Sequence, residues 1–266
     1  MSASAADSRA ARLVLNIYVG LFVLYLFLPL AVMSAAAFNS YDYPSVTQWR
    51  GFTLQWFVAL AHDQRLLQGL ANSVMVALGV IAVSIPAGLS GALILTRLQA
   101  RSGTVLYSVL VSPVLTPGII LGISSLIFWR EFGVPGGLFV AVMAQSSFIA
   151  SYAMLLFLAR LQRQDRTLEE AALDLGASHF MVFRRITLPF LAPTAFTAAV
   201  VAFLQSFENY NTTVFAIGGE WTLVTEIASR MRFGLSPVIN VVGVIFVALT
   251  LLAATSYVLL KGKPTR

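Results

Sequence analysis

Six long segments of the chain contain no aspartate, glutamate, lysine or arginine. A membrane-spanning helix needs about 20 predominantly apolar residues, because the hydrocarbon core of a bilayer is roughly 30 Å thick and each helical residue rises about 1.5 Å. Each of the six segments is long enough to meet this requirement. They therefore predict an all-α membrane protein with six transmembrane helices, at residues 13–38, 73–96, 104–128, 138–159, 190–207 and 237–260.

The composition agrees with this prediction. Hydrophobic residues make up 58% of the 266 residues and charged residues only 11%, whereas about a quarter of the residues in a soluble domain are charged. No soluble domain is apparent at either end of the chain. We therefore expect residues 1–266 to form a single transmembrane domain.

The positive charges are distributed unevenly between the two sides of the predicted membrane. Twelve of the 17 lysine and arginine residues fall in the N-terminal arm, the second and fourth connections, and the C-terminal tail. Cytoplasmic loops of membrane proteins carry such an excess, so both termini are predicted to be cytoplasmic. Topology thereby accounts for the net charge of +6, and no nucleic-acid partner is expected.

Several kinds of chemistry lack the residues they need. The chain has no cysteine for a thiolate nucleophile, and only His62 and His179 as imidazole ligands for a metal. A Walker A loop needs a lysine that reaches the nucleotide phosphates, but Lys261 and Lys263 both lie in the tail, outside any such loop. We expect the chain to bind no metal and no cofactor, so any ATP must be bound elsewhere.

Residues 160–189 form the only long connection on the predicted cytoplasmic side. Thr167 and Glu170 have the spacing of a capping box at a helix start. Gly176 suits a left-handed position at a helix end, and Ser178 can cap a second helix. Pro189 is expected to end that second helix, because proline lacks an amide donor and restricts the residue before it. The segment is therefore predicted to form two short helices joined by a glycine turn.

The same segment carries a recognisable motif. Glu170-Ala171-Ala172 is followed after three residues by Gly176, and after nine more by Ile186-Thr187-Leu188-Pro189. This pattern resembles the EAA loop of permease subunits of binding-protein-dependent ABC importers. Three further stretches are similar to the spermidine/putrescine-type permeases of that group, at Gly51–Trp56, Ser112-Pro113 and Arg232–Asn240.

The resemblance implies a type I ABC importer permease fold, with residues 160–189 as a cytoplasmic coupling loop. In that family the permease is a passive pore that converts the motion of partner ATPase subunits into alternating access, and it is not an enzyme. ATP and magnesium would therefore be held by the partners. The residues implied to contact the ATPase are Glu170, Ala171, Ala172, Gly176, Ile186, Leu188 and Pro189.

The partners implied by the resemblance are two ATPase subunits, a second homologous permease and a solute-binding protein. A heterodimer of permeases is expected, with a periplasmic or lipid-anchored binding protein. The chain would lie in the lipid bilayer of the bacterial inner membrane as a multi-pass protein.

A solute path needs polar groups that face inward at membrane depth, since lipid offers them no partner. Isolated serines and threonines usually bond their own helix, whereas a glutamine amide has more hydrogen-bonding capacity than one carbonyl can satisfy. An acid beside a tyrosine at the outer mouth could attract a cationic amine, although it could equally be an exposed loop acid without a role. Prolines are expected to bend the third span. The candidates for the path are Gln145, Gln205, Glu208, Asn209, Tyr210, Pro113 and Pro117.

Two other classes of function compete with the importer. A secondary transporter often has ionisable residues within its spans and internal repeats, and neither is apparent here. A membrane enzyme needs a catalytic cluster, but helix capping and docking account for the acids Glu169, Glu170 and Asp174. Within the importer class a polyamine or related amine is the favoured solute. An opine, an amino-acid derivative, an anion or a sugar are the alternatives.

Overall fold

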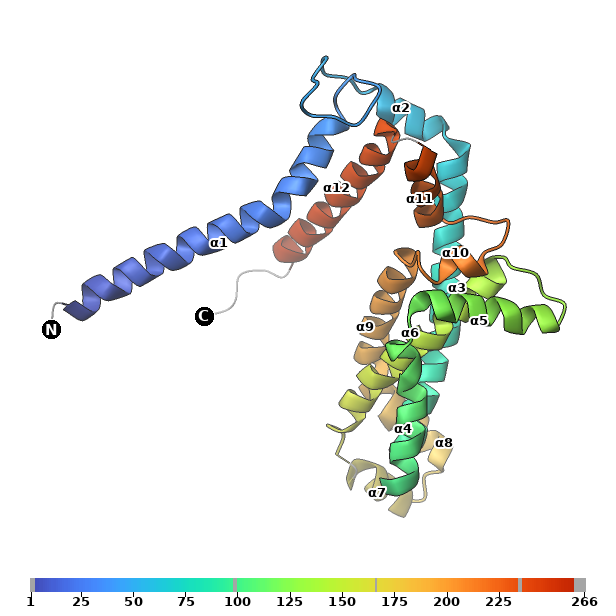
Figure 1. The fold of residues 1–266 in the computed structure, drawn as a ribbon. Helices are drawn as coiled ribbons and strands as arrows, with labels where there is room; N and C mark the ends of the chain where they lie inside the picture. The colour runs from blue at the N-terminus through green and yellow to red at the C-terminus, as the bar shows by residue number, and fades with distance from the viewer. Residues whose placement is uncertain (1–2, 98–99, 166, 234–235, 261–266) are drawn as a thin grey trace. The chain divides into compact units, whose positions relative to one another are not determined.

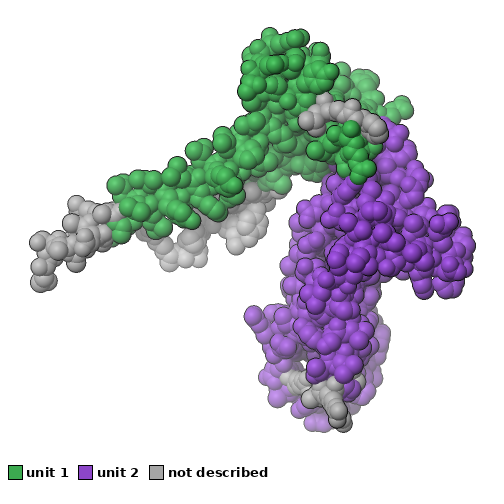
Figure 2. Space-filling model, viewed as in Figure 1, with its two compact units in different colours: residues 1–64, 227–266 green, residues 65–226 purple. Residues whose placement is uncertain are grey.

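The computed structural model describes residues 3–97, 100–165, 167–233 and 236–260. Over these ranges the regular structure is helical, and the exception is an isolated antiparallel bridge between Asn39 and Phe52. Figure 1 shows the helices, and Figure 2 shows the two compact units into which the chain divides. The first unit consists of residues 1–64 and 227–266, and the second of residues 65–226. The prediction of a single domain remains a prediction.

The first unit contains the terminal helices. α1 (Ala3–Ala36) contacts α12 (Pro237–Leu260), which also contacts the short α2 (Gln55–His62). The approach of α1 to α12 is close at Gly243, where an added Cβ would lie 2.5 Å from Met33 Cε. None of the most apolar 18-residue stretch of α1 is buried, so this helix presents its apolar side chains outward along most of its length.

The loop between α1 and α2 is organised by Asn39, whose side chain is fully buried. Asn39 Nδ2 donates hydrogen bonds to the carbonyl oxygens of Ser45 and Gln48, and Oδ1 accepts from the backbone amides of Tyr41 and Arg50. An amide side chain has two donor and two acceptor positions. All four are used here, so this single buried residue holds the loop in one conformation.

The second unit holds most of the helices, with α11 (Leu223–Phe233) beginning in it at residues 223–226 and continuing into the first unit. The other elements are α3 (Gln64–Leu95), α4 (Ala100–Leu115), α5 (Gly118–Glu131), α6 (Leu138–Leu161), α7 (Thr167–Asp174), α8 (His179–Val182), the π-helix η1 (Phe183–Thr187), α9 (Leu188–Phe207) and α10 (Thr213–Ala216).

The core of the second unit forms around α6, which contacts α4, α5, α9 and α10. Small residues allow close packing of α3 on α6: an added Cβ on Gly88 would lie 2.7 Å from the carbonyl oxygen of Ala150. Close packing replaces the hydrophobic effect as the main attraction between helices in lipid. One buried cluster joins three helices and consists of Ala92, Ala153, Met154, Phe157, Leu191 and Ala198.

The described helices agree with most of the predicted spans. Four are long and apolar enough to cross a membrane, and α4 with α5 makes a fifth if the pair is one bent span. α12 has the bounds of the sixth predicted span, but its described apolar stretch, Pro237–Leu252, is shorter. The four long helices are Ala11–Ala36, Gln64–Leu95, Leu138–Leu161 and His179–Phe207.

The helix that contains the second predicted span begins before that span. The prediction began at Ser73, but α3 begins at Gln64 and has 32 residues. A helix of this length is about 48 Å long, well beyond the hydrocarbon thickness of roughly 30 Å. A run without charged residues marks the part of a helix that can lie in lipid. The helix itself can continue beyond that part.

The predicted bend in the third span is confirmed. Residues 102–115 and 118–131 form two helices at 104° to one another. Pro117 has extended backbone angles, φ −54° and ψ 134°, and directly precedes α5, whereas Pro113 lies inside α4. Proline disfavours the helical conformation for the residue before it. Pro117, which follows Thr116, therefore coincides with the break, and the helix tolerates Pro113.

Candidate functional site

The first helix of the predicted coupling loop, α7, starts with a different cap from the one predicted. Thr167 is itself the first residue of α7. Its backbone amide and its hydroxyl both donate to Asp165 Oδ1, at 3.0 and 2.8 Å. The predicted capping box of Thr167 with Glu170 was therefore wrong. The amide of Thr167 bonds Asp165, two residues upstream, in place of the Glu170 carboxylate. The hydroxyl and then the amide of Thr167 lower the pKa of Asp165 below its ordinary value of 3.8.

The turn after α7 is the one that the sequence predicts. Gly176 has φ +86°, in the left-handed region. The amide of Gly176 donates to the carbonyl of Leu173, and the amide of Ala177 donates to that of Ala172. This pair of hydrogen bonds is the Schellman pattern of helix ends. Ser178 then caps α8 by accepting a hydrogen bond from the amide of Met181, so the predicted helix–turn–helix is confirmed.

The second helix does not end near Leu188, as Pro189 was expected to require. α8 continues directly into η1 and α9, and Pro189 lies in the first turn of α9. Proline lacks the amide hydrogen that would bond a carbonyl one turn earlier in the helix, and it is tolerated in the first turn. A wider turn before it changes which carbonyls the neighbouring amides bond. The five-residue π-helix η1 provides that wider turn, so α8 runs through η1 into α9 without a break.

Glu169 anchors α7 to the rest of the second unit, a role that the sequence analysis missed. Glu169 Oε1 accepts hydrogen bonds from Gln164 Nε2 at 2.8 Å and from the Thr187 hydroxyl at 2.5 Å. Thr187 is buried. A hydrogen bond to a carboxylate is about twice as strong as a neutral one, so it ties α7 to the base of α9. No local spacing pattern relates these residues.

The structure places the predicted ATPase-contact residues at one end of the second unit, where Figure 1 shows α7 and α8. Glu170, Ala171 and Gly176 are exposed, and Ala172 is half-buried. The remaining three predicted residues lie where η1 continues into α9: Ile186 is half-buried, and Leu188 and Pro189 are exposed.

Large apolar side chains are also exposed on α7, on α8 and in the turn between them. Leu175 is 90% exposed and Phe180 is 71% exposed. Leu168 and Met181 add to this surface, which we call the coupling face, and its apolar members are Leu168, Leu175, Phe180 and Met181. Several large apolar residues exposed on one short segment outside the predicted spans indicate a protein-binding surface.

The predicted path residues are placed in different environments. Gln145 is 1% exposed and donates from Nε2 to the Thr213 hydroxyl at 2.7 Å, while its Oε1 is buried without a hydrogen-bond partner. Gln205 and Tyr210 are half-buried, and Glu208 is exposed at the C-cap of α9. Asn209 Oδ1 accepts a hydrogen bond from the amide of Thr212. Gln145 thus contacts the segment after α9.

That segment, residues 208–217, packs closely against α5 at two glycines. An added Cβ on Gly122 would lie 2.4 Å from the carbonyl oxygen of Thr212, and one on Gly118 would lie 2.8 Å from the Thr212 hydroxyl. A Gly-xxx-Gly spacing is common wherever helices pack. Here it permits contact with a loop and the short α10, so the bent third span positions the polar residues that follow α9.

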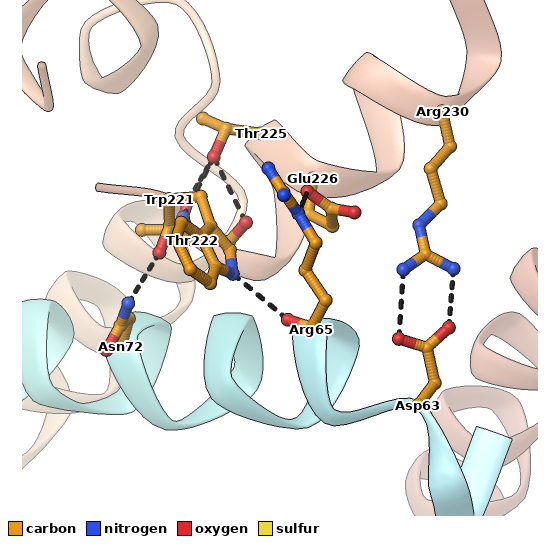
Figure 3. Close-up of polar contacts among 8 residues, drawn as sticks. All are labelled: Asp63, Arg65, Asn72, Trp221, Thr222, Thr225, Glu226 and Arg230. Atoms are coloured by element: carbon orange, nitrogen blue, oxygen red, sulfur yellow. Dashed lines mark hydrogen bonds and ion pairs between the residues drawn. The ribbon is translucent and has the colours of Figure 1, made fainter. Parts of the chain in front are cut away.

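A polar cluster joins the start of α3 to the start of α11, and it was not predicted (Figure 3). Arg65 Nε pairs with Glu226 Oε2 at 2.8 Å, and the Arg65 guanidinium lies 4.7 Å from the centre of the Trp221 ring. The Trp221 carbonyl accepts from Asn72 Nδ2, and Ser73 Oγ accepts from the amide of Leu223. Glu226 is 4% exposed, and Arg65 is the cation that pairs with it.

The comparisons with known proteins agree with the motif. The family described as "Binding-protein-dependent transport system inner membrane component" matches residues 84–263. The chain is 26% identical to the spermidine/putrescine transport system permease protein PotC of Escherichia coli (strain K12), over 91% of both chains. It is 29% identical to the putrescine transport system permease protein PotI of the same organism, over 81% of this chain and 79% of the relative.

Solved structures have the same fold. A bacterial ABC transporter involved in the import of the acidic polysaccharide alginate contains a chain with a TM-score of 0.70 and 17% identity, covering 97% of this chain and 98% of that one. The MetNI methionine ABC transporter in inward-facing conformations contains a chain with a TM-score of 0.56 and 20% identity, covering 80% and 100%. The chain therefore belongs to the family of binding-protein-dependent transport system inner membrane components, and it is a membrane permease subunit and not an enzyme.

Proposed function

We propose that this chain forms one half of the translocation path of an ATP-driven importer for a polyamine or related amine, and that the coupling face transmits the motion of an ATPase subunit to the path. The observation that carries the coupling role is the helix–Gly176–helix segment with its exposed apolar side chains, at the spacing of the EAA motif. Helices of eight and four residues are too short to be stable alone, and these are held by the rest of the unit.

The physical route for coupling runs from α7 to α9. Glu169 connects α7 to Thr187, and η1 joins α8 to α9 without a break. A displacement imposed on the coupling face would therefore move the base of α9 as well. Glu170 is exposed, so it can offer its carboxylate to an arginine or to backbone amides of the ATPase.

The partners of the proposal are two ATPase subunits that hold ATP and magnesium, a second homologous permease and a periplasmic or lipid-anchored solute-binding protein. One solved relative is a bacterial alginate ABC transporter in complex with an alginate pentasaccharide-bound periplasmic protein. In this proposal the permeases form a heterodimer, and both termini of this chain are cytoplasmic, as its distribution of lysine and arginine favours.

The names of the relatives PotC and PotI support a polyamine as the solute. Glu208 is the candidate that fits a cation best, since it is an exposed carboxylate at the C-terminal end of α9. The negative end of a helix dipole lies there, so an acid at this position does not stabilise the helix. The helix therefore does not depend on the Glu208 charge for its stability. That charge can attract an amine, and a substitution that removes it should leave the fold intact.

Co-purification tests the coupling role. The tagged chain would be purified in mild detergent from its host, and its partners identified by mass spectrometry. We expect an ATPase and a second permease. The variant Leu175→Asp should lose the ATPase and keep the permease, whereas Leu54→Asp, on an exposed residue of the other unit, should keep both. An ATPase retained by Leu175→Asp, or transport by the chain reconstituted alone, would contradict the proposal.

Uptake of labelled putrescine by the reconstituted complex tests the solute. Glu208→Gln should lower uptake up to about fivefold without changing the subunit composition, because an exposed charge pair contributes about 1 kcal/mol or less. Unchanged uptake in this variant would contradict a role of Glu208 in the solute path. Absence of putrescine uptake by the wild-type complex would contradict the proposed solute and would not bear on the ATPase coupling.

A further inference from the structure

The loop between α1 and α2 exposes several large apolar and aromatic side chains (Figure 1). Tyr43 is 63% exposed, Trp49 is 51% exposed and Phe52 is 70% exposed, and Val46 is exposed as well. We call residues 39–54 the aromatic loop, and these four residues are its exposed members. Such side chains on one short segment indicate a surface that interacts with another molecule or with a membrane.

The backbone of the aromatic loop is folded back onto the end of α1. The amide of Thr53 donates to the carbonyl of Phe38 at 2.8 Å, and the amide of Ser40 donates to that of Gly51 at 2.9 Å. The Phe52 and Phe38 rings are stacked, with their centres 5.4 Å apart. These contacts and the buried side chain of Asn39 hold Phe52 beside the end of α1.

The length of α1 sets the level of that end in a bilayer. Its apolar stretch, Ala11–Ala36, has 26 residues and is therefore about 39 Å long. The hydrocarbon core of a bilayer is about 30 Å thick, and the thickness including the headgroup layers is about 40–45 Å. A stretch of this length that spans the bilayer ends in a headgroup layer on each side. The aromatic loop starts directly after one of these ends.

The aromatic side chains suit a headgroup layer. Among the described residues, neither the Tyr43 hydroxyl nor Trp49 Nε1 has a hydrogen-bond partner. Each ring is apolar over most of its surface and carries one polar atom that can bond water or a headgroup. Tryptophan and tyrosine are enriched at this level of membrane proteins for that reason.

The charges of the aromatic loop fit the same layer. Residues 39–54 contain one acid, Asp42, and one cation, Arg50, so the formal charge of the loop is zero. The exposed Arg50 guanidinium lies 4.6 Å from the centre of the Tyr41 ring. A guanidinium has the donor geometry for a phosphate group, which the headgroups of phospholipids supply.

We infer that the aromatic loop is a membrane anchor and that its partner is the headgroup layer of the lipid bilayer. Lipid is the favoured occupant because the loop continues directly from α1, whose most apolar stretch is wholly unburied. The anchor holds the end of α1 at one depth: Tyr43, Val46, Trp49 and Phe52 enter the layer, and Arg50 meets lipid phosphate. This role requires neither the ATPase nor the solute.

Spin labels on single cysteines test the anchor, since the chain has no cysteine of its own. The full-length chain in phospholipid nanodiscs would carry a label in Trp49→Cys or Phe52→Cys. Collisions with oxygen, which concentrates in lipid, and with a nickel complex, which stays in water, would be measured. Tyr25→Cys, on an exposed residue of α1, provides the hydrocarbon reference, and Leu175→Cys, on the coupling face, provides the water reference. We expect oxygen-to-nickel ratios between these two references.

A second label, in Val46→Cys, reports what holds the loop in the layer. Trp49→Asp combined with Phe52→Asp should shift the ratio at position 46 toward the water reference, because lipid disfavours ionised side chains. Phe180→Asp is the matched control. It changes an almost equally exposed phenylalanine of the other unit and should leave that ratio unchanged.

Three results would overturn the inference. Ratios at positions 49 and 52 equal to that of Leu175→Cys would mean that the loop lies in water. Few collisions with either reagent would mean that protein covers the loop. An unchanged ratio at position 46 in the double aspartate variant would mean that the aromatic side chains do not hold it. None of these results bears on ATPase co-purification or on putrescine uptake, so the anchor and the proposed function can fail separately.

Discussion

Glu169 accepts a hydrogen bond from the hydroxyl of Thr187, which lies eighteen residues later in the chain. The contact joins α7 to the end of η1, immediately before α9. Because Thr187 is buried and the acceptor is a carboxylate, the contact fixes α7 more firmly than its eight residues could achieve alone.

Removal of this contact should loosen α7 and leave the membrane helices intact. Thr187→Val keeps the volume of the side chain and removes the donor. Hydrogen exchange of residues 167–174 should become about tenfold faster, because a hydrogen bond to a carboxylate contributes about 1.5 kcal/mol. Thr197→Val is the control, since the Thr197 hydroxyl bonds a carbonyl of its own helix. Equal exchange in both variants would mean that Glu169 does not anchor α7.

The packing of residues 208–217 against α5 depends on the lack of a side chain at Gly122. In Gly122→Ala the new Cβ would lie 2.4 Å from the carbonyl oxygen of Thr212, which forces the loop away from α5. We expect a loss of about 1–3 kcal/mol, as in other overpacked sites, measured as a lower Tm in detergent. Gly20→Ala should not lower the Tm, because no atom lies within 4 Å of its added Cβ.

The Arg65–Glu226 pair should stabilise the start of α11. Arg65→Met removes the arginine from a carboxylate that is 4% exposed. Breaking a fully buried pair costs about 3–5 kcal/mol, but the Arg65 side chain is 60% exposed, so about 1–2 kcal/mol is expected after allowance for solvent. Thermal unfolding of Arg65→Met and of Arg184→Met, on an exposed residue of η1, provides the comparison. Equal Tm values would assign the cluster no stabilising role.

Acid should weaken the start of α7. The pKa of Asp165 is lowered by the hydroxyl and the amide of Thr167, so its contribution to stability is present above the unfolded value of 3.8 and is lost as the pH falls through the lower folded value. The nuclear magnetic resonance shift of the Thr167 amide should titrate with a midpoint below 3.8. Asp165→Asn should abolish this titration, and a midpoint above that value would contradict the hydrogen bonds.

The local sequence patterns predicted much of the architecture correctly. The charge-free runs predicted the long helices, because lipid excludes ionised side chains along a whole span. Gly176 and Ser178 predicted the turn between α7 and α8, since only backbone geometry within a few residues is involved. The bend near Pro117 was predictable for the same reason.

The errors arose where two local preferences competed. Asp165 and Glu170 were both within reach of the free amides at the start of α7, and the structure shows that Asp165 accepts that of Thr167. At Pro189 the preference of proline for a helix end competed with its tolerance in the first turn of a helix. The π-helix η1 allowed the helix to continue, and nothing in the sequence pattern indicated it.

The sequence by itself determined the membrane class and the EAA spacing, because these depend on hydrophobicity and on neighbouring residues along one segment. Only the tertiary structure decided that Glu169 contacts Thr187, that Gly122 contacts Thr212, and that Glu226 pairs with Arg65, 161 residues away. Such contacts depend on how the helices pack. A pattern of residue types along the chain contains no distance between segments.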